Sequence, residues 1–473
     1  MSGALALTPL TGVRAADLTD LPGLTANQTA IAAAIDVVCP QLVQRAQTGQ
    51  LNSQQTELQQ TCTGMKQNAN ALLDDGLTTF SFGLDDPQLK DALTQLSNQK
   101  NTTPNTAATK ADAGQTVIAD RLSVLRAGAG GFAIGGFGFD LDGQLVDLGV
   151  LIANGPGDTQ KWGGAAGDQS FVPRFGGFLN GIVSWGKLDP TENRAGYDFD
   201  TAGVTAGLDY RLTDNAIVGA AFNYSNQTAD LNKGILLAGG DVDADVFSGS
   251  IFGTYYIGDF YIDGIGTFSG VDYTIKREII IPSSNPAAES VSTVATGDPG
   301  ANGYALSFGS GYDGRYQQWS YSPYVRLDYR KLDIDGYTET GAGGLNLKVE
   351  EQDVSSLIFA LGGQIAYSIS TPFGIVVPRF RAEYNHEFDD DSVLLRAQYF
   401  APIDPSNDLT ATGLTNPVFE ARTGEPDRDF AVIGGGISAV FQRNVQAFID
   451  FESVVGRSKV SNNILTTGVR VEF

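Results

Sequence analysis

The end of the chain alternates strictly between apolar and polar side chains. Val469, Val471 and Phe473 fall on one face of an extended segment, while Thr466 and Arg470 fall on the other. Successive side chains of a β-strand point to opposite faces, so this segment predicts a strand with one wholly apolar face. Such a strand belongs either in a sheet packed on a core or in a barrel surrounded by lipid.

The same alternation recurs in the segments 204–212, 324–330, 376–388 and 448–452. Their polar faces mix arginine with aspartate and glutamate, whereas a soluble β-sandwich covers its polar face with lysine and threonine. Mixed charges on one face predict ion pairs inside a closed barrel. The expected lumen charges are Asp209, Arg211, Arg326, Asp328, Arg330, Arg379, Arg381, Glu383, Glu387, Asp450, Glu452, Arg470 and Glu472.

From about residue 175 onward, short turns alternate with long polar connections such as 281–302 and 400–428. Outer-membrane barrels have short periplasmic turns and long external loops. The sequence therefore predicts an all-β transmembrane barrel of about 12 antiparallel strands within residues 172–473. The expected strands are 175–187, 198–212, 216–231, 243–257, 260–278, 303–315, 319–337, 345–370, 375–392, 430–441, 446–458 and 463–473. The aromatic residues expected in girdles at the lipid interfaces are Tyr210, Tyr255, Tyr256, Phe260, Tyr261 and Trp185.

Upstream of the strands, the apolar residues follow a helical period. Capping boxes at Thr25 and Asn52 precede two runs of apolar residues spaced three or four positions apart. A third helix is expected from Asp86, and a fourth over 115–126. The expected segments are a signal-peptide remnant over 1–15, a helical region over 16–126 and a Gly-rich linker with a hairpin over 127–171.

The chain has two cysteines, Cys39 and Cys62, which fall one in each of the first two predicted helices. In an oxidising compartment we expect them to form a disulfide, and two buried thiols are the alternative. A metal site is not expected, because no histidine or third cysteine accompanies them.

Several motifs of the strand region resemble those of autotransporter β-domains. They are Phe178-x-Asn180-Gly181, Trp185-Gly186-Lys187, the run from Gly196 to Asn215, Gly253-Thr254-Tyr255-Tyr256, Asp333-Ile334-Asp335-Gly336-Tyr337 and the final Val469-Arg470-Val471-Glu472-Phe473. The resemblance covers about residues 172–473. It implies a twelve-stranded barrel in the cell outer membrane of a Gram-negative bacterium, which helps to bring its own N-terminal passenger to the cell surface (type V secretion). A helix before the first strand usually occupies the pore.

The chain also departs from this family. Its N-terminal region is short and helical, without the long β-helical repeat typical of passengers, and it lacks the Gly-Asp-Ser motif of the esterase autotransporters. Residues 25–126 could therefore lie outside the cell, in the periplasm or partly in the lumen. The helix over 115–126 is the candidate plug of the pore.

The last strand also resembles the C-terminal signal of bacterial outer-membrane barrels. Thr466, Gly468, Val471 and Phe473 occupy its four places. The resemblance implies as partners the barrel-assembly machinery, periplasmic chaperones, outer-membrane lipid and lipopolysaccharide. We expect a monomer.

The composition argues against nucleic-acid binding and against histidine-based catalysis. A net charge of −24 disfavours contact with phosphates. His386 is the single histidine and lies on the face opposite the charged row of its strand, at the lipid-side rim or above the membrane, where we expect a surface histidine rather than a catalytic base. The acidic residues Glu387, Asp389, Asp390 and Asp391 predict a solvated loop rather than a cation site. We expect no enzyme activity, no cofactor and no metal.

Three functions follow from these observations. The first is an autotransporter-type barrel that inserts in the outer membrane and translocates and anchors a short non-enzymatic N-terminal region. The alternatives are a passive, porin-like channel and a surface adhesin or receptor that acts through the loops 281–302 and 400–428.

Overall fold

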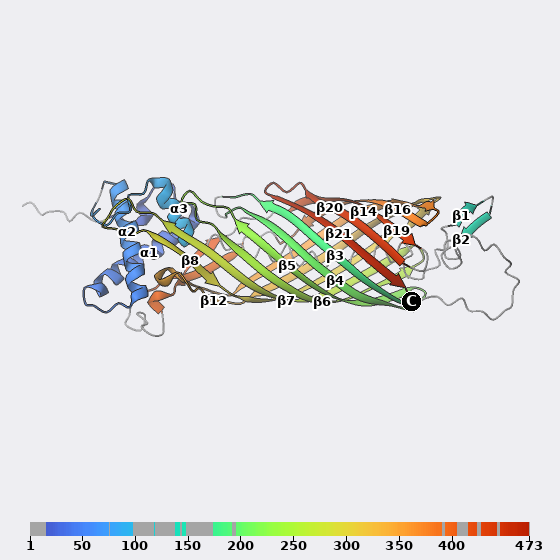
Figure 1. Ribbon diagram of the computed structural model, residues 1–473, viewed down its shortest axis with the longest axis horizontal. Coiled ribbons are helices and arrows are strands. Elements are labelled where there is room, and N and C mark those ends of the chain that lie inside the picture. Colours follow the sequence, from blue (N-terminus) through green and yellow to red (C-terminus); the bar gives the residue numbers. More distant parts are fainter. Residues whose placement is uncertain are drawn as a thin grey trace, which may run out of the picture.

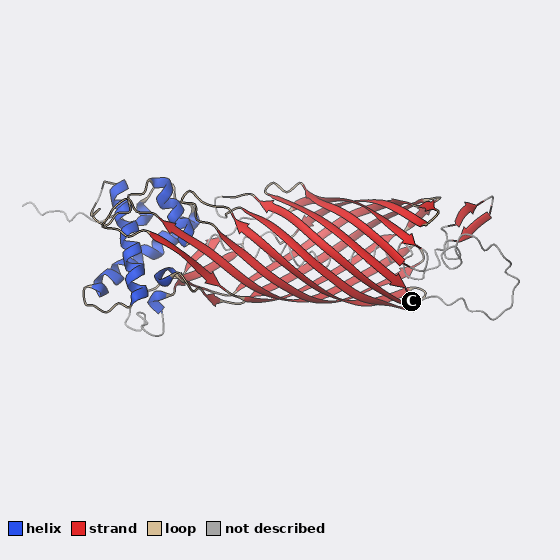
Figure 2. Ribbon diagram, viewed as in Figure 1, coloured by secondary structure: helices blue, strands red, loops and turns tan. Residues whose placement is uncertain are grey.

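The protein is elongated, with a barrel of strands in the middle and helices gathered at one end (Figures 1 and 2). The computed structural model describes residues 16–74, 76–97, 118, 138–141, 144–147, 174–191, 195–389, 393–403, 415–422, 427–441 and 445–472. The expected signal-peptide remnant, most of the linker and most of the helix over 115–126 lie outside these residues.

Among the described residues, 12 antiparallel strands close into a ring, in which the last strand pairs with the first. They are β3 (Phe175–Leu188), β4 (Tyr197–Thr213), β5 (Ala216–Leu231), β6 (Gly240–Ile257), β7 (Phe260–Ile281), β9 (Gly300–Tyr312), β11 (Trp319–Ile334), β14 (Gln352–Tyr367), β16 (Gly374–Glu387), β19 (Asp429–Phe441), β20 (Val445–Val455) and β21 (Val460–Glu472). Closure leaves the ring without a free edge. The predicted barrel class is confirmed.

The outer surface of the barrel carries a broad apolar band. The outward-facing side chains of Leu208, Phe222, Ile251, Phe308 and Leu361 are each more than half exposed. A continuous exposed apolar surface of this kind is stable in lipid and not in water. The middle of the barrel therefore spans the membrane.

Toward the end with the long loops, the barrel reverses its polarity. Asp198, Asp230 and Asp272 face outward and are exposed, whereas Phe199 and Ile275 face inward and are buried. Carboxylates are costly in lipid, so this end projects beyond the membrane. Its interior is an apolar core formed by Leu188, Tyr197, Phe199, Ala229, Leu231, Val242, Ala244, Val246, Val271, Tyr273, Ile275, Ala301 and Ile334.

In the part of the chain that the structure describes, three α-helices and one short 3-10 helix lie at the long-loop end of the barrel, away from the C-terminus (Figure 1). They are η1 (Leu18–Asp20), α1 (Ala26–Ala46), α2 (Ser53–Leu72) and α3 (Asp86–Leu96). The capping boxes expected at Thr25 and Asn52 are present, and a third occurs at Asp85. In the described part of the chain, no helix has the length and apolarity needed to cross a membrane.

The long connections contain secondary structure, which corrects the expectation of plain polar loops over 281–302 and 400–428. The additional elements are β8 (Val291–Gly297), β12 (Tyr337–Thr338), η2 (Gly343–Leu345), β13 (Leu347–Val349), β17 (Leu394–Tyr399), η3 (Ala401–Ile403) and β18 (Phe419–Arg422). Of these, β12, β13, β17 and β18 form a separate four-stranded sheet. The expected strand over 345–370 is therefore divided between two sheets, because β13 leaves the barrel.

Smaller hairpins complete the described structure. β1 (Gly138–Leu141) and β2 (Gln144–Asp147) pair as the hairpin expected in the Gly-rich linker. β10 (Gly314–Tyr316) and β15 (Ile369–Thr371) extend two barrel hairpins at the short-turn end.

Two of the six aromatic residues expected at the lipid interfaces face the wrong way for that role. Tyr261 is buried inside the barrel, and Tyr256 packs against an inner apolar cluster. Each is the immediate neighbour of an outward-facing aromatic residue, Tyr255 or Phe260. Because neighbouring side chains on a strand alternate, only one member of each pair reaches the lipid.

Candidate functional site: barrel lumen and helical cap

Paired charges fill part of the barrel lumen. Arg326 contacts Glu383 through two bonds, from Nη1 to Oε2 at 3.0 Å and from Nη2 to Oε1 at 3.1 Å, and its Nε lies 2.8 Å from Asp328. Arg379 donates from Nε to Asp450 at 2.7 Å, and Arg381 pairs with Glu452. Each guanidinium therefore neutralises carboxylates from its own strand or from the next strand but one, across the strand that lies between them.

The remaining predicted lumen charges also lie on inward-facing positions. Arg470 Nη2 is 3.6 Å from Asp209 Oδ1, and both side chains are buried, as is Arg211. Glu387 is buried and accepts a hydrogen bond from Ser356 Oγ at 2.6 Å. Arg330 is half-buried on the same face as Arg326 and Asp328. The side chain of Glu472 lies outside the described residues.

Residues of the predicted C-terminal signal occupy both faces of β21. Thr466 is buried in the lumen, whereas Val471 is exposed on the outer surface. A side chain at Gly468 would clash, because its Cβ would lie 2.1 Å from Asn180 Oδ1. Phe473 lies outside the described residues.

Ile118 is the one described residue of the predicted plug helix, and it is helical. Its side chain is buried in an apolar cluster with the inward-facing Phe178, Ile217, Phe252 and Ile265. These four residues lie near the short-turn ends of β3, β5, β6 and β7. Ile118 therefore lies in the lumen.

Residues 16–97, here called the helical cap, close the opposite end of the barrel (Figure 1). The cap shares one apolar core with the loop platform, which we define as β8, β12, β13, β17, β18, η2 and η3 together with Leu236 of the loop after β5 and the adjoining end of β7. Leu58 and Met65 of α2 belong to the same buried cluster as Leu347 and Tyr399 of the platform. The cap is thus packed into the fold of the long-loop end of the barrel.

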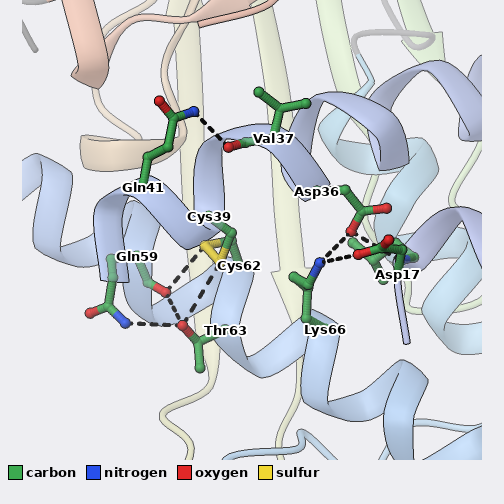
Figure 3. Close-up of a disulfide and its surroundings, with 10 residues drawn as sticks. Asp17, Asp36, Val37, Cys39, Gln41, Gln59, Cys62, Thr63 and Lys66 are labelled. Atoms are coloured by element: carbon green, nitrogen blue, oxygen red, sulfur yellow. Dashed lines mark hydrogen bonds and ion pairs between the residues drawn. A yellow bond between two sulfur atoms is a disulfide. The ribbon is translucent and has the colours of Figure 1, made fainter. Parts of the chain in front are cut away.

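Within the cap, a disulfide joins Cys39 of α1 to Cys62 of α2 (Figure 3). Beside it, Lys66 Nζ lies 2.8 Å from Asp17 Oδ1 and 2.8 Å from Asp36 Oδ1. Burial alone would lower the pKa of Lys66, but its hydrogen bonds to both carboxylates raise that pKa above the ordinary value. The covalent bond and the ion pairs together hold η1, α1 and α2 in one unit.

Sequence patterns did not reveal the ion pair at the boundary between barrel and cap. Arg277 and Glu339 are both buried, and the Arg277 guanidinium reaches Glu339, the Gln95 carbonyl of the cap and the Leu345 carbonyl of the platform. One signal was available, because Arg277 interrupts the apolar face formed by Ile275, Ile279 and Ile281 on β7. An arginine on such a face indicates a buried partner.

No group of three or more His, Cys, Asp or Glu side chains in the described residues is arranged to hold a metal ion. His386 lies on the outer side of β16, with Nδ1 at 2.8 Å from Asp429 Oδ1. A cavity of about 630 Å³ opens on the outer surface between Leu208, Ile251 and Phe308, where apolar groups surround it.

Among the comparisons with known proteins, a family model identifies the family. The model of the autotransporter beta-domain matches residues 177–452. Esterase EstA of Pseudomonas aeruginosa is 28% identical over 250 residues, which are 52% of this chain and 36% of EstA. Outer membrane protein A of Rickettsia rickettsii is 22% identical over 321 residues, which are 65% of this chain and 13% of that protein. The chain thus spans little more than a third, or less, of the length of these curated relatives.

Among solved structures, the translocator domain of autotransporter NalP from Neisseria meningitidis has a TM-score of 0.48 at 14% identity. The match covers 63% of this chain and 89% of that domain. Because the family model covers more than half of the 473 residues, the protein belongs to the autotransporter β-domain family and is an outer-membrane barrel of a Gram-negative bacterium.

Proposed function

We propose that the barrel brings its own helical cap to the cell surface and anchors it there. The observation that carries this proposal is the path of the chain. The helical cap lies at the long-loop end, Ile118 lies in the lumen, and β3 begins at the short-turn end. These three placements are those expected of a chain that passes once through the barrel between the cap and the first strand.

The orientation of the barrel gives this path its direction. Tight turns, such as the one between β4 and β5, lie at the end where β21 also finishes. In outer-membrane barrels the short turns are periplasmic and the long loops are external. The cap then lies outside the cell. The segment that connects the cap to β3 would pass through the lumen because the cap was exported through the barrel.

We assign the cap an anchored, non-enzymatic role. The likeness to esterase EstA lies in the barrel region and covers 36% of that protein, so it does not extend an esterase activity to this cap. The chain has one histidine, His386, which lies on the barrel and not in the cap. A histidine-dependent nucleophile in the cap is therefore not available from this chain.

Labelling of intact cells tests the display of the cap. Gln47 follows α1 and is exposed, and Asp214 lies in a short turn at the opposite end of the barrel. The native cysteines are both held in the disulfide and do not react. A membrane-impermeant maleimide should label Gln47→Cys in intact cells and Asp214→Cys only after the outer membrane is permeabilised. The reverse pattern would reject surface display.

A further inference from the structure

We infer that the loop platform is a specific binding surface for the helical cap, strong enough to retain the cap after the connecting chain is cut. The inference builds on the proposed function, which places this surface outside the cell. It concerns a different property, because retention depends on contacts between cap and platform and not on the direction of export. It can therefore fail or succeed in purified protein, whatever the cell-surface labelling shows.

The first support is the apolar core that cap and platform share. It includes Ile31, Leu58 and Leu93 from the three cap helices, and Leu345 and Phe419 from the platform. The backbones also approach closely. A Cβ at Gly344 of η2 would lie 2.1 Å from the Gln54 carbonyl and 2.6 Å from the Leu58 nitrogen on α2. Contacts this close occur where two elements have folded against each other.

The second support is a set of cap amide side chains that satisfy platform backbone. Asn27 both donates to the Arg422 carbonyl and accepts from its nitrogen, each at 2.9 Å, at the edge of β18. Gln41 makes the same two-way contact with Thr415, at 3.0 Å and 2.8 Å. Without the cap, these backbone groups lose their partners, and β18 presents an unprotected edge.

Further amides extend the contact to the other helices of the cap. Gln55 of α2 donates to the Ala401 carbonyl at 3.0 Å, and Gln95 of α3 accepts from the Ile280 nitrogen at 2.8 Å. Both glutamine side chains are buried. All three helices therefore supply amides that fit platform backbone, which is the mark of a specific surface rather than of general apolar adhesion.

The third support is the buried Arg277, which ties the barrel wall to both partners. Its Nε lies 3.0 Å from Glu339, its Nη1 donates to the Gln95 carbonyl at 2.9 Å, and its Nη2 donates to the Leu345 carbonyl at 3.1 Å. The Gln95 carbonyl is in the last turn of α3, where helix carbonyls lack partners within the helix. Arg277 thus closes the end of α3 and fixes Glu339 at the same time.

Cleavage between cap and lumen tests the inference in the purified full-length protein. A protease site flanked by Gly-Ser linkers is inserted after Asn105, within the polar stretch between α3 and Ile118. After complete cleavage in detergent, the cap fragment should elute with the barrel on size exclusion, one cap per barrel. Elution of the cap separately from a folded barrel would overturn the inference.

Two single substitutions on adjacent residues of β7 sharpen this test. Arg277→Met breaks the buried pair, and release of the cut cap should become faster by on the order of a hundredfold. Lys276→Met is the matched control, because Lys276 pairs with Asp241 on the outer face, 2.9 Å away, and should leave release unchanged. Asn27→Leu weakens the contact from the cap side without touching the barrel. Equal release rates for all three variants and the unsubstituted protein would show that these contacts do not hold the cap.

Discussion

At the scale of single residues, glycines permit the close packing of aromatic rings inside the barrel. Gly219 on β5 lies beside Phe252, and an added Cβ would be 2.2 Å from the ring and 2.7 Å from the Leu208 carbonyl. Phe252 in turn contacts the cluster that contains Ile118. Because Gly219 has no side chain, the Phe252 ring can pack against β5 and contact the cluster that contains Ile118.

This packing predicts a position-specific cost of adding one methyl group. Gly219→Ala should lower the free energy of unfolding by about 1–3 kcal/mol, because the backbone carbonyl cannot move away as a flexible side chain could. Gly249 on β6 faces open space, so Gly249→Ala should change stability by no more than about 0.5 kcal/mol. Guanidinium unfolding followed by tryptophan fluorescence measures both. Equal decreases in the free energy of unfolding for Gly219→Ala and Gly249→Ala would mean that the Phe252 ring and its surroundings can move to accommodate the methyl group.

At the scale of elements, Lys66 of α2 holds together η1 and α1 through Asp17 and Asp36. Its pKa is raised in the folded protein, so its contribution to stability is fully present below the unfolded pKa of about 10.4 and is lost as pH rises through the folded pKa. Lys66→Met should destabilise the cap by about 1–3 kcal/mol at neutral pH. The difference in free energy of unfolding between Lys66→Met and wild type should disappear at strongly alkaline pH, because Lys66 is then uncharged.

Urea unfolding of the helical signal at several pH values measures this dependence. Lys90→Met is the control, because Lys90 pairs with Asp86 four residues away on the surface of α3, a contact worth about 0.3–0.5 kcal/mol. If Lys66→Met lowers the free energy of unfolding at neutral pH by as little as Lys90→Met does, the ion pairs of Lys66 with Asp17 and Asp36 do not stabilise the cap.

The elements also show how far sequence patterns reach. Long strands such as β6 and β21 repeat the period of two many times, and α1 and α2 begin with capping boxes, so each is predictable from its own residues. The platform strands have between two and seven residues, too few for a period to emerge. They form because amide side chains of the cap and the shared apolar core stabilise them. The residues that stabilise them lie far from them in the sequence, so a local pattern cannot predict these strands.

The same distinction applies to the candidate site. The inward-facing charges follow from alternation alone, since the face of a side chain is fixed by its position on the strand. Their partners do not follow, because the register between β16 and β20, which brings Arg379 to Asp450, depends on both strands pairing with β19. Arg277 and Glu339 are 62 positions apart, and no local pattern links them.

At the scale of the whole molecule, the pore is closed at more than one level. Ile118 occupies the lumen near the short turns, an apolar core fills the end beyond the membrane, and the helical cap covers the mouth. Closure at separate levels predicts that removing one leaves the others in place. This distinguishes an anchored translocator from a passive channel, which needs a continuous water path.

Planar-bilayer recordings on three forms of the protein test this closure. The full chain should give no steady ion conductance, and a deletion of residues 16–96 should stay closed because it keeps Ile118. A chain that begins at residue 174 loses the cap and Ile118 but keeps the apolar core of the projecting end, so in this form that core is also opened by Phe199→Asp and Ile275→Asp. Water should then enter among the lumen charges and ions should pass. A difference in gel migration between unheated and heated samples shows that each barrel is folded. Steady conductance through the intact full chain, at the level of the shortest form, would favour the channel function over anchoring, since paired charges and a buried Ile118 could not then be blocking the path.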